Sequence, residues 1–237
     1  MVELLVVVAV IGILAAVILP ALRKTLTSGQ QTACTGNLRS LIAGWQLYCA
    51  DHNGNSFRYD WANVDYMRYP YWAGQMAQYL GDDNTKKVFL CPTANKPNPQ
   101  GGVGSSTQAW SEPHAGELFA SSYGLNAYWY SNLAEMFPGD PDLVDVIGNV
   151  NRATFPTPVI ADSAWVDNQW MAPVPSDFVK GTRWAIARHR NKGINMAFSD
   201  GSVRFATMGE YYRDYRMHAN DVVPHLDRYE KVPPQYR

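Results

Sequence analysis

The feature that most constrains this chain is an uninterrupted apolar run near its start. The nineteen residues from Leu4 to Leu22 carry no charge and no side chain more polar than glycine or proline. As a helix, this run is about 28 Å long at ~1.5 Å per residue, close to the ~30 Å hydrocarbon core of a bilayer. The segment can therefore span a membrane.

Two simple explanations of the run are a cleaved signal peptide and a plain single-pass anchor. A signal peptide has positive charge before its apolar stretch, whereas this sequence has Glu3 there, and no obvious small-x-small cleavage site precedes Arg23. A plain anchor leaves Glu3 unexplained, because a carboxylate costs about 2.5–3.5 kcal/mol at a bilayer centre and needs a partner near its end too. The acid indicates an assembly that supplies such a partner.

The sequence ELLVVVAVIGILAAVILPAL resembles the N-terminal helix of type IV pilins and type II secretion pseudopilins. That family has a glutamate near the start of the mature chain, a mid-run glycine and a later proline, which Glu3, Gly12 and Pro20 match. The resemblance implies that prepilin peptidase removes a basic leader, that the new N-terminus is methylated, and that these helices bundle in a filament core. It also implies that Glu3 pairs with the N-terminal amine of a neighbouring subunit.

The match departs from the family pattern at the beginning. The leader, the cleavage-site glycine and the first two mature residues of the pattern do not precede Glu3, where Met1 and Val2 stand. We take the numbering to begin late or the N-terminus to be incompletely determined, which leaves the amine partner of Glu3 open.

Gly12 and Pro20 both weaken the helix in which they lie. Glycine has low helix propensity, and Pro20 has no N–H to donate and clashes with the carbonyl of residue 16. We expect the helix to be interrupted between about Gly12 and Pro20 when assembled, and a helix merely kinked at Pro20 is the alternative.

Beyond Arg23 the apolar residues recur at three- and four-residue steps, which predicts an amphipathic helix with one stripe against a globular head. The stripe consists of Leu26, Cys34, Leu38, Leu41, Ile42, Trp45, Tyr48 and Cys49. Turn formers at 51–54 end it. We expect one helix of about fifty residues, divided into an apolar membrane or filament-core part (1–24) and an amphipathic part (25–52).

Two further segments sharpen the resemblance. CTGNLRSLIAGWQLYCADHNG looks like the C-x-x-N-L…Y-x-x-D-x-x-G segment of large pilin-like proteins that carry an H-X9-DG C-terminal domain. Its matched residues are Cys34, Asn37, Leu38, Tyr48, Asp51 and Gly54. SSYGLNAYWY, at 121–130, matches a recurrent S-Y-G-x-N element of the same proteins. The implied fold is α+β and pilin-like, with the long helix packed on an antiparallel β-sheet head.

Three cysteines leave room for one disulfide and one free thiol. Cys34 and Cys49 lie about 22 Å apart along an intact helix, and a disulfide needs Cα atoms within ~7 Å, so Cys91 can reach only one of them. Cys34–Cys91, Cys49–Cys91 and three free thiols all remain open on this argument. VFLCPTAN resembles the family's L-x-C-P element, which implies Cys34–Cys91 and a buried free Cys49. The absence of a paired C-x-x-C spacing argues against zinc.

Residues 53–206 read as the globular head. WAGQMAQYL predicts a short helix, and residues 92–107, rich in proline and glycine, predict an exposed loop. Val159–Ala161, RWAIARH, INMAFSDG and SVRFATM predict strands, with a hairpin turn at Asp200-Gly201. Antiparallel strands packed on the long helix would close the head. Residues 207–237 predict an arm that runs over a surface.

The segment RHRNKGINMAFSDGSV corresponds to the H-X9-DG motif through His189, Asp200 and Gly201, with ten rather than nine intervening residues. A functional interpretation makes His189, Asp200 and Asp162 a site. A structural interpretation has Asp200 capping its own turn and His189 hydrogen-bonding to the hairpin. We favour the structural one, since two residues supply neither a nucleophile nor a metal shell.

Asp51, Asn53 and Asn55 resemble an oxygen-rich calcium loop, and some pseudopilins bind calcium in their heads. Ala62 stands where the twelfth-position glutamate belongs, which excludes an EF-hand. A turn is the simpler interpretation. Calcium is the one cofactor the sequence admits, and we otherwise expect none.

The formal net charge of −1 gives no global basic field for nucleic acid. Motifs such as G-x-S-x-G and H-E-x-x-H are absent, so we expect no enzyme. The sequence predicts a structural subunit of an extracytoplasmic type IV pilus-like or pseudopilus filament that polymerises with itself. We expect the subunit to contact prepilin peptidase, the inner-membrane assembly machinery and, before assembly, the membrane itself. We expect it to be located first in the inner membrane and then in an extracellular or periplasmic filament. The alternative is a membrane-anchored binding module whose surface aromatics hold carbohydrate or serve adhesion.

Overall fold

The structure is a computed structural model and shows an α+β, pilin-like architecture. The part of the chain that it describes comprises residues 2–59, 71–81, 85–114, 117–136, 138, 147–153, 156–168, 186–189, 193–207 and 209–211. The expected C-terminal arm, beyond residue 211, lies outside these residues. Residues 190–192, which belong to the ten that separate His189 from Asp200, also lie outside them.

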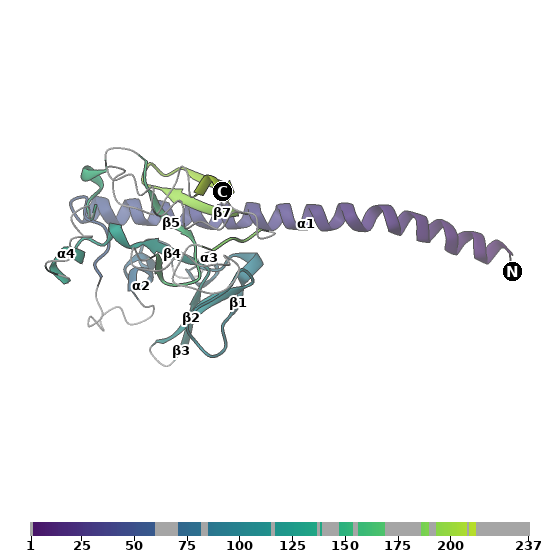
Figure 1. The fold of residues 1–237 in the computed structure, drawn as a ribbon, viewed down its shortest axis with the longest axis horizontal. Helices are drawn as coiled ribbons and strands as arrows, with labels where there is room; N and C mark the ends of the chain where they lie inside the picture. Colours follow the sequence, from purple (N-terminus) through teal and green to yellow (C-terminus); the bar gives the residue numbers. More distant parts are fainter. Residues whose placement is uncertain are drawn as a thin grey trace.

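The long helix α1 runs from Val2 to Asp51 without interruption, 50 residues in all. Its N-terminal part extends away from the head, and its C-terminal part lies along the head (Figure 1). Pro20 lies inside the continuous helix of this single chain. The interruption expected near Gly12 and Pro20 concerns the assembled filament and stays a prediction.

The packed stripe of α1 is shorter than expected. Leu26 is 60% exposed, and the buried residues begin at Cys34. Periodicity marked Leu26 as part of the stripe, but a side chain is buried only where another element covers it, and burial begins about two turns further on, at Cys34. The predicted end of the helix is confirmed, since α1 ends at Asp51 and Gly54 follows with φ of 82°.

Two small sheets form the head. The larger has the strand order β6-β4-β5-β7-β8, and the smaller has the order β1-β2-β3. Their strands are β1 (Lys96–Pro97), β2 (Gln108–His114), β3 (Glu117–Ser121), β4 (Tyr123–Asn126), β5 (Pro158–Asp162), β6 (Asp167–Asn168), β7 (Gly193–Phe198) and β8 (Val203–Thr207). Neighbours pair antiparallel except for the two-residue contacts of β1 with β2 and of β6 with β4, which are parallel. The C-terminal half of α1 packs against β7, β5 and β8.

The described part of the head also contains short helices, several of which pack against α1. They are α2 (Tyr71–Ala77), α3 (Thr85–Val88), η1 (Pro92–Ala94), η2 (Ala127–Trp129), α4 (Leu133–Met136) and η4 (Val150–Arg152). The helix predicted within WAGQMAQYL is confirmed as part of α2. The exposed loop predicted for residues 92–107 is only partly confirmed: six of these residues are exposed, eight are half-buried, Ala94 and Gly104 are buried, and η1 and β1 interrupt the loop.

The predicted strands at 159–161 and in the last two apolar segments are confirmed as β5, β7 and β8. The strand predicted for RWAIARH is wrong over the described residues 186–189, where only Arg188 bridges to Gly193. His189 has φ of 53°, which is incompatible with an extended strand. The segment RWAIARH looks like a strand in sequence because Ile186 and Ala187 are apolar. Neighbouring elements bury both side chains although the segment forms no strand over its described residues.

The core between α1 and the sheet is built from aromatic rings. Trp45, Trp72, Trp110 and Trp129 are completely buried, and Trp45 contacts Trp129 edge-on with ring centroids 4.9 Å apart. Each indole N–H has a partner; that of Trp45, for example, donates to Ser56 Oγ at 2.8 Å. Rings of this size supply most of the apolar area that holds a head with so few long strands.

Candidate functional site

The candidate assembly residues lie on the part of α1 that no other described element covers. Every residue from Val2 to Leu26 is exposed, including Glu3, Gly12 and Pro20. A Cβ added at Gly12 would meet no atom of this chain within 4 Å. By length and composition, α1 is able to cross a membrane. All three residues lie on this exposed segment, which no described part of the head covers.

The head is tied covalently to α1 at the point where packing begins. Cys34 and Cys91 form a disulfide with Cα atoms 5.0 Å apart, and 57 residues separate them in sequence. The pairing implied by the family resemblance is confirmed, and the rival Cys49–Cys91 is wrong. Cys49 is free and buried, as expected. Burial raises the pKa of the Cys49 thiol to about 12, which keeps it protonated and unreactive.

The structure separates the residues of the H-X9-DG motif. Asp200 lies in the exposed turn between β7 and β8, where its Oδ1 accepts the backbone N–H of Ser202 at 2.9 Å. Hydrogen bonds from Ser202 lower the pKa of Asp200. Gly201 follows with φ of 83°, the conformation that favours glycine. Asp200 therefore caps its own hairpin, as the structural interpretation expected, and it takes no part in the cluster around His189.

His189 lies against the other end of the hairpin. Its Nε2 is 2.6 Å from Nδ2 of Asn195, a residue of β7. Asp162, the last residue of β5, accepts both the backbone N–H of Asn195 at 2.8 Å and the Nδ2 of Asn195 at 3.1 Å through Oδ2. His189 and Asp162 thus meet through Asn195, which the sequence interpretation did not single out.

Arg188 completes this buried cluster. Its side chain and that of Asp162 are 0% exposed, with Nε 3.8 Å from Oδ1, and its Nη2 donates to the carbonyl of Ser163 at 2.7 Å. Burial lowers the pKa of Arg188, and the Asp162 carboxylate opposes that effect. Sequence reasoning missed Arg188. The available signal was a charged pair, Arg188-His189, directly after buried Ile186 and Ala187.

Polar atoms in the cluster are incompletely paired. Among the described residues, Asp162 Oδ1, Asn195 Oδ1, His189 Nδ1 and two nitrogens of Arg188 are buried without a hydrogen-bond partner. In a low-dielectric interior such groups interact strongly with any charge or donor nearby. The cluster is the most polar part of the otherwise aromatic core.

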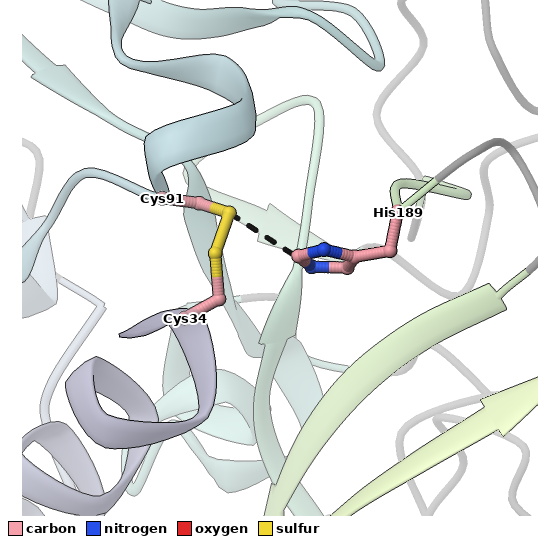
Figure 2. Close-up of side chains that lie close together, drawn as sticks. All are labelled: Cys34, Cys91 and His189. Atoms are coloured by element: carbon pink, nitrogen blue, oxygen red, sulfur yellow. Dashed lines mark hydrogen bonds between the residues drawn. A yellow bond between two sulfur atoms is a disulfide. The ribbon is translucent and has the colours of Figure 1, made fainter. Parts of the chain in front are cut away.

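The disulfide and the histidine are neighbours in space. Figure 2 shows the imidazole of His189 pointing at the sulfur of Cys91, at an Nε2–Sγ distance of 3.9 Å. The Sγ atoms of both cysteines and Nε2 of His189 all lie within 4.8 Å of one another. Spacing in sequence could not reveal this, since 98 residues separate Cys91 from His189.

The calcium candidates form a hydrogen-bonded turn. Asp51 Oδ2 accepts the hydroxyl of Tyr79 at 3.0 Å. Asn149 Nδ2 donates to Asn55 Oδ1 at 2.7 Å and to the carbonyl of Asn53 at 3.2 Å. These hydrogen bonds use one oxygen of each of the three residues, as expected of a turn, and the calcium assignment stays a prediction.

No family model, curated protein or solved structure matches this chain. A function for it therefore has to be argued from the geometry above.

Proposed function

We propose that this chain is a structural subunit of an extracytoplasmic filament of the type IV pilus or pseudopilus kind, which polymerises through the exposed part of α1. One observation carries the proposal. A single helix of 50 residues presents a fully exposed apolar half, while its other half is the spine of a folded head.

The exposed apolar surface is too large to remain in water. The leucine, isoleucine and valine side chains between Val2 and Leu22 are 49–73% exposed. Complete burial of one such side chain gains roughly 1.5–3 kcal/mol, so the segment as a whole gains tens of kcal/mol on leaving water. A bilayer or a bundle of like helices supplies that environment.

Glu3 favours the bundle over a lone anchor. It lies in the first turn of α1, directly before the apolar run. A carboxylate held in a water-poor environment needs an opposite charge or several donors. In a filament core, a neighbouring subunit's terminal amine would supply that charge.

The disulfide supports the location outside the cytoplasm. Bridges persist in oxidising compartments, and the apolar helix supplies membrane insertion or an export signal. The finer steps are part of the proposal: an inner-membrane precursor, prepilin peptidase, the assembly machinery, and a periplasmic or extracellular filament. The proposal assigns no catalytic role to the chain.

A binding module based on surface aromatics has less support. Of the five described tryptophans, four are completely buried and Trp165 is half-buried. Trp61, Trp170 and Trp184 lie outside the described residues. No described tryptophan is offered to a sugar or an adhesion partner, so we do not propose this function.

Replacing Glu3 with alanine should abolish filament formation or reduce it severely, while the head stays folded. The helix keeps its apolar surface but loses the charge that sets its position against a neighbour. Filaments sheared from cells, counted by negative-stain microscopy and quantified by sedimentation, measure the effect. Near-ultraviolet circular dichroism of the detergent-solubilised chain checks the head.

Glu135→Ala is the matched control. Glu135 is an exposed acid of α4 that makes a 3.6 Å surface contact with Arg58, so its loss should leave assembly unchanged. Normal filament yield from the Glu3→Ala chain would show that the carboxylate has no role in assembly.

A further inference from the structure

We propose that Cys34, Cys91 and His189 bind one zinc-type divalent metal ion when the disulfide is reduced. The bridge and the metal would then be two alternative links between α1 and the head. This inference concerns the junction between α1 and the head and does not depend on the filament proposal.

Three separate segments place the ligands. Cys34 lies on α1, Cys91 directly precedes η1, and His189 lies just before β7. The two sulfurs and Nε2 lie within 4.8 Å of one another, and all three residues are at most 5% exposed. A tetrahedral zinc ion with Zn–S near 2.3 Å and Zn–N near 2.0–2.1 Å holds S and N about 3.6 Å apart and two S about 3.8 Å apart.

The histidine already stands at nearly this distance. Its Nε2 lies 3.9 Å from Cys91 Sγ, close to the sulfur–nitrogen separation in a zinc site. Breaking the disulfide bond frees the two sulfurs to move apart by about 2 Å, which gives the sulfur–sulfur separation that a zinc site requires.

The hydrogen bonds around His189 leave the correct nitrogen as an electron-pair donor. The Asn195 amide is oriented by Asp162, whose carboxylate can only accept hydrogens, so its NH₂ group faces both Asp162 and Nε2. Nε2 therefore accepts, which places the proton of the neutral ring on Nδ1. A metal uses that same lone pair and would displace the Asn195 hydrogen.

The carboxylate beside His189 and the backbone conformation of His189 also favour a metal at this position. Asp162 Oδ2 is 3.6 Å from Nε2, so a carboxylate, paired on its other oxygen with Arg188, lies beside the proposed cation. His189 adopts φ of 53°, a conformation that non-glycine residues rarely take and that is often found at functional sites. The backbone at this residue is held where it directs the ring at the sulfurs.

The donor set selects the metal. Two thiolates and an imidazole suit zinc, cobalt or cadmium, whereas calcium and magnesium require oxygen ligands. Three protein ligands leave a fourth coordination position, which water can fill. The result is a buried Cys₂His site.

The disulfide is converted to the metal site in two steps, reduction and metal binding. A dithiol reductant gives two electrons and two protons to the Cys34–Cys91 bond and becomes a disulfide itself, leaving two thiols in the protein. Metal binding forms two metal–sulfur bonds and one metal–nitrogen bond and releases both thiol protons to solvent. Reoxidation requires the metal to leave first.

Cobalt(II) titration of the full chain in detergent tests the site. The chain is reduced with dithiothreitol, freed of reductant without air, and titrated. We expect one cobalt per chain, with sulfur-to-cobalt charge-transfer bands and the intense visible bands of a four-coordinate ion, both lost when zinc is added. His189→Ala should weaken binding at least about tenfold. The oxidised chain should show no such bands.

Cys49→Ser is the matched control, because Cys49 lies on the same helix but about 22 Å from Cys34 and should not affect binding. Equal cobalt binding by the His189→Ala chain or by the oxidised chain, an effect of Cys49→Ser, or no binding at all would each overturn the proposal.

A measurement on the unaltered chain avoids the risk that variants fail to fold. Zinc should slow reformation of the bridge by oxidised dithiothreitol at least about tenfold, since bound thiolates cannot attack a disulfide. Zinc should also raise the thermal midpoint of the reduced chain and keep or restore its near-ultraviolet circular dichroism. If zinc changes neither the oxidation rate nor the midpoint, no such site exists.

Discussion

The Asp162→Ala chain should lose about 3–5 kcal/mol of unfolding free energy, the loss typical of removing one partner from a buried ion pair. Asp162 is completely buried and is the carboxylate nearest the buried guanidinium of Arg188. With alanine at position 162, Arg188 would keep its hydrogen bond to the Ser163 carbonyl, but its buried charge would no longer be compensated by the Asp162 carboxylate. It would also leave two donors of Asn195 without their acceptor.

Guanidinium unfolding of the detergent-solubilised chain, followed by tryptophan fluorescence, measures this loss. The buried tryptophans report on the same core that the cluster occupies. Since domains are typically stable by about 5–15 kcal/mol, the transition midpoint should fall by about a fifth or more.

Two comparisons isolate the cause. Asp200→Ala removes an exposed acid that contacts Arg204 at 4.0 Å and caps its own turn, so it should cost only about 1 kcal/mol. The double variant Asp162→Ala/Arg188→Met should be more stable than Asp162→Ala alone, because it removes the unpaired charge. If Asp162→Ala costs no more than Asp200→Ala, the buried ion pair does not stabilise the head.

Removing the disulfide should lower the free energy of unfolding by a comparable amount. The Cys34→Ala/Cys91→Ala chain opens a loop that joins residues 57 apart, and the chain-entropy relation assigns about 4 kcal/mol to a loop of that size. The bridge lies at the first buried turn of α1, so its loss should also loosen the head from the helix.

Unfolding with and without reductant measures this effect. The oxidised chain should unfold at a clearly higher denaturant concentration than the double variant, and dithiothreitol without metal should lower it to the variant's value. Cys49→Ala, which removes a free buried thiol, is the control and should cost less, about 1 kcal/mol, and remain sensitive to reductant. A double variant as stable as the oxidised chain would show that the bridge adds nothing.

Much of the architecture was predictable because it depends on local patterns. The apolar run and the periodicity after it predicted α1, the turn formers at 51–54 predicted its end, and Asp200-Gly201 predicted the β7–β8 hairpin. Each of these is governed by residues close together in the chain. The Cys34–Cys91 pairing followed from the family resemblance, since helix geometry alone excluded only Cys34–Cys49.

The failures share one cause, which is that burial depends on distant segments. Leu26 fits the helical stripe, yet it is exposed and no described element of the head covers it. Residues 186–189 look like a strand, yet the positive φ of His189 makes them a turn beside the hairpin. Periodicity shows which side of an element is apolar, but not whether anything covers that side.

The amino-acid sequence by itself determined the long helix, its apolar exposed half with Glu3, and the hairpin, because hydrophobic periodicity and turn chemistry act over a few residues. Only the tertiary structure decided where the head begins on that helix and what surrounds Asp162. It alone brought His189 within 3.9 Å of Cys91. Contacts between residues about a hundred positions apart depend on how whole elements pack, and no spacing along the chain encodes them.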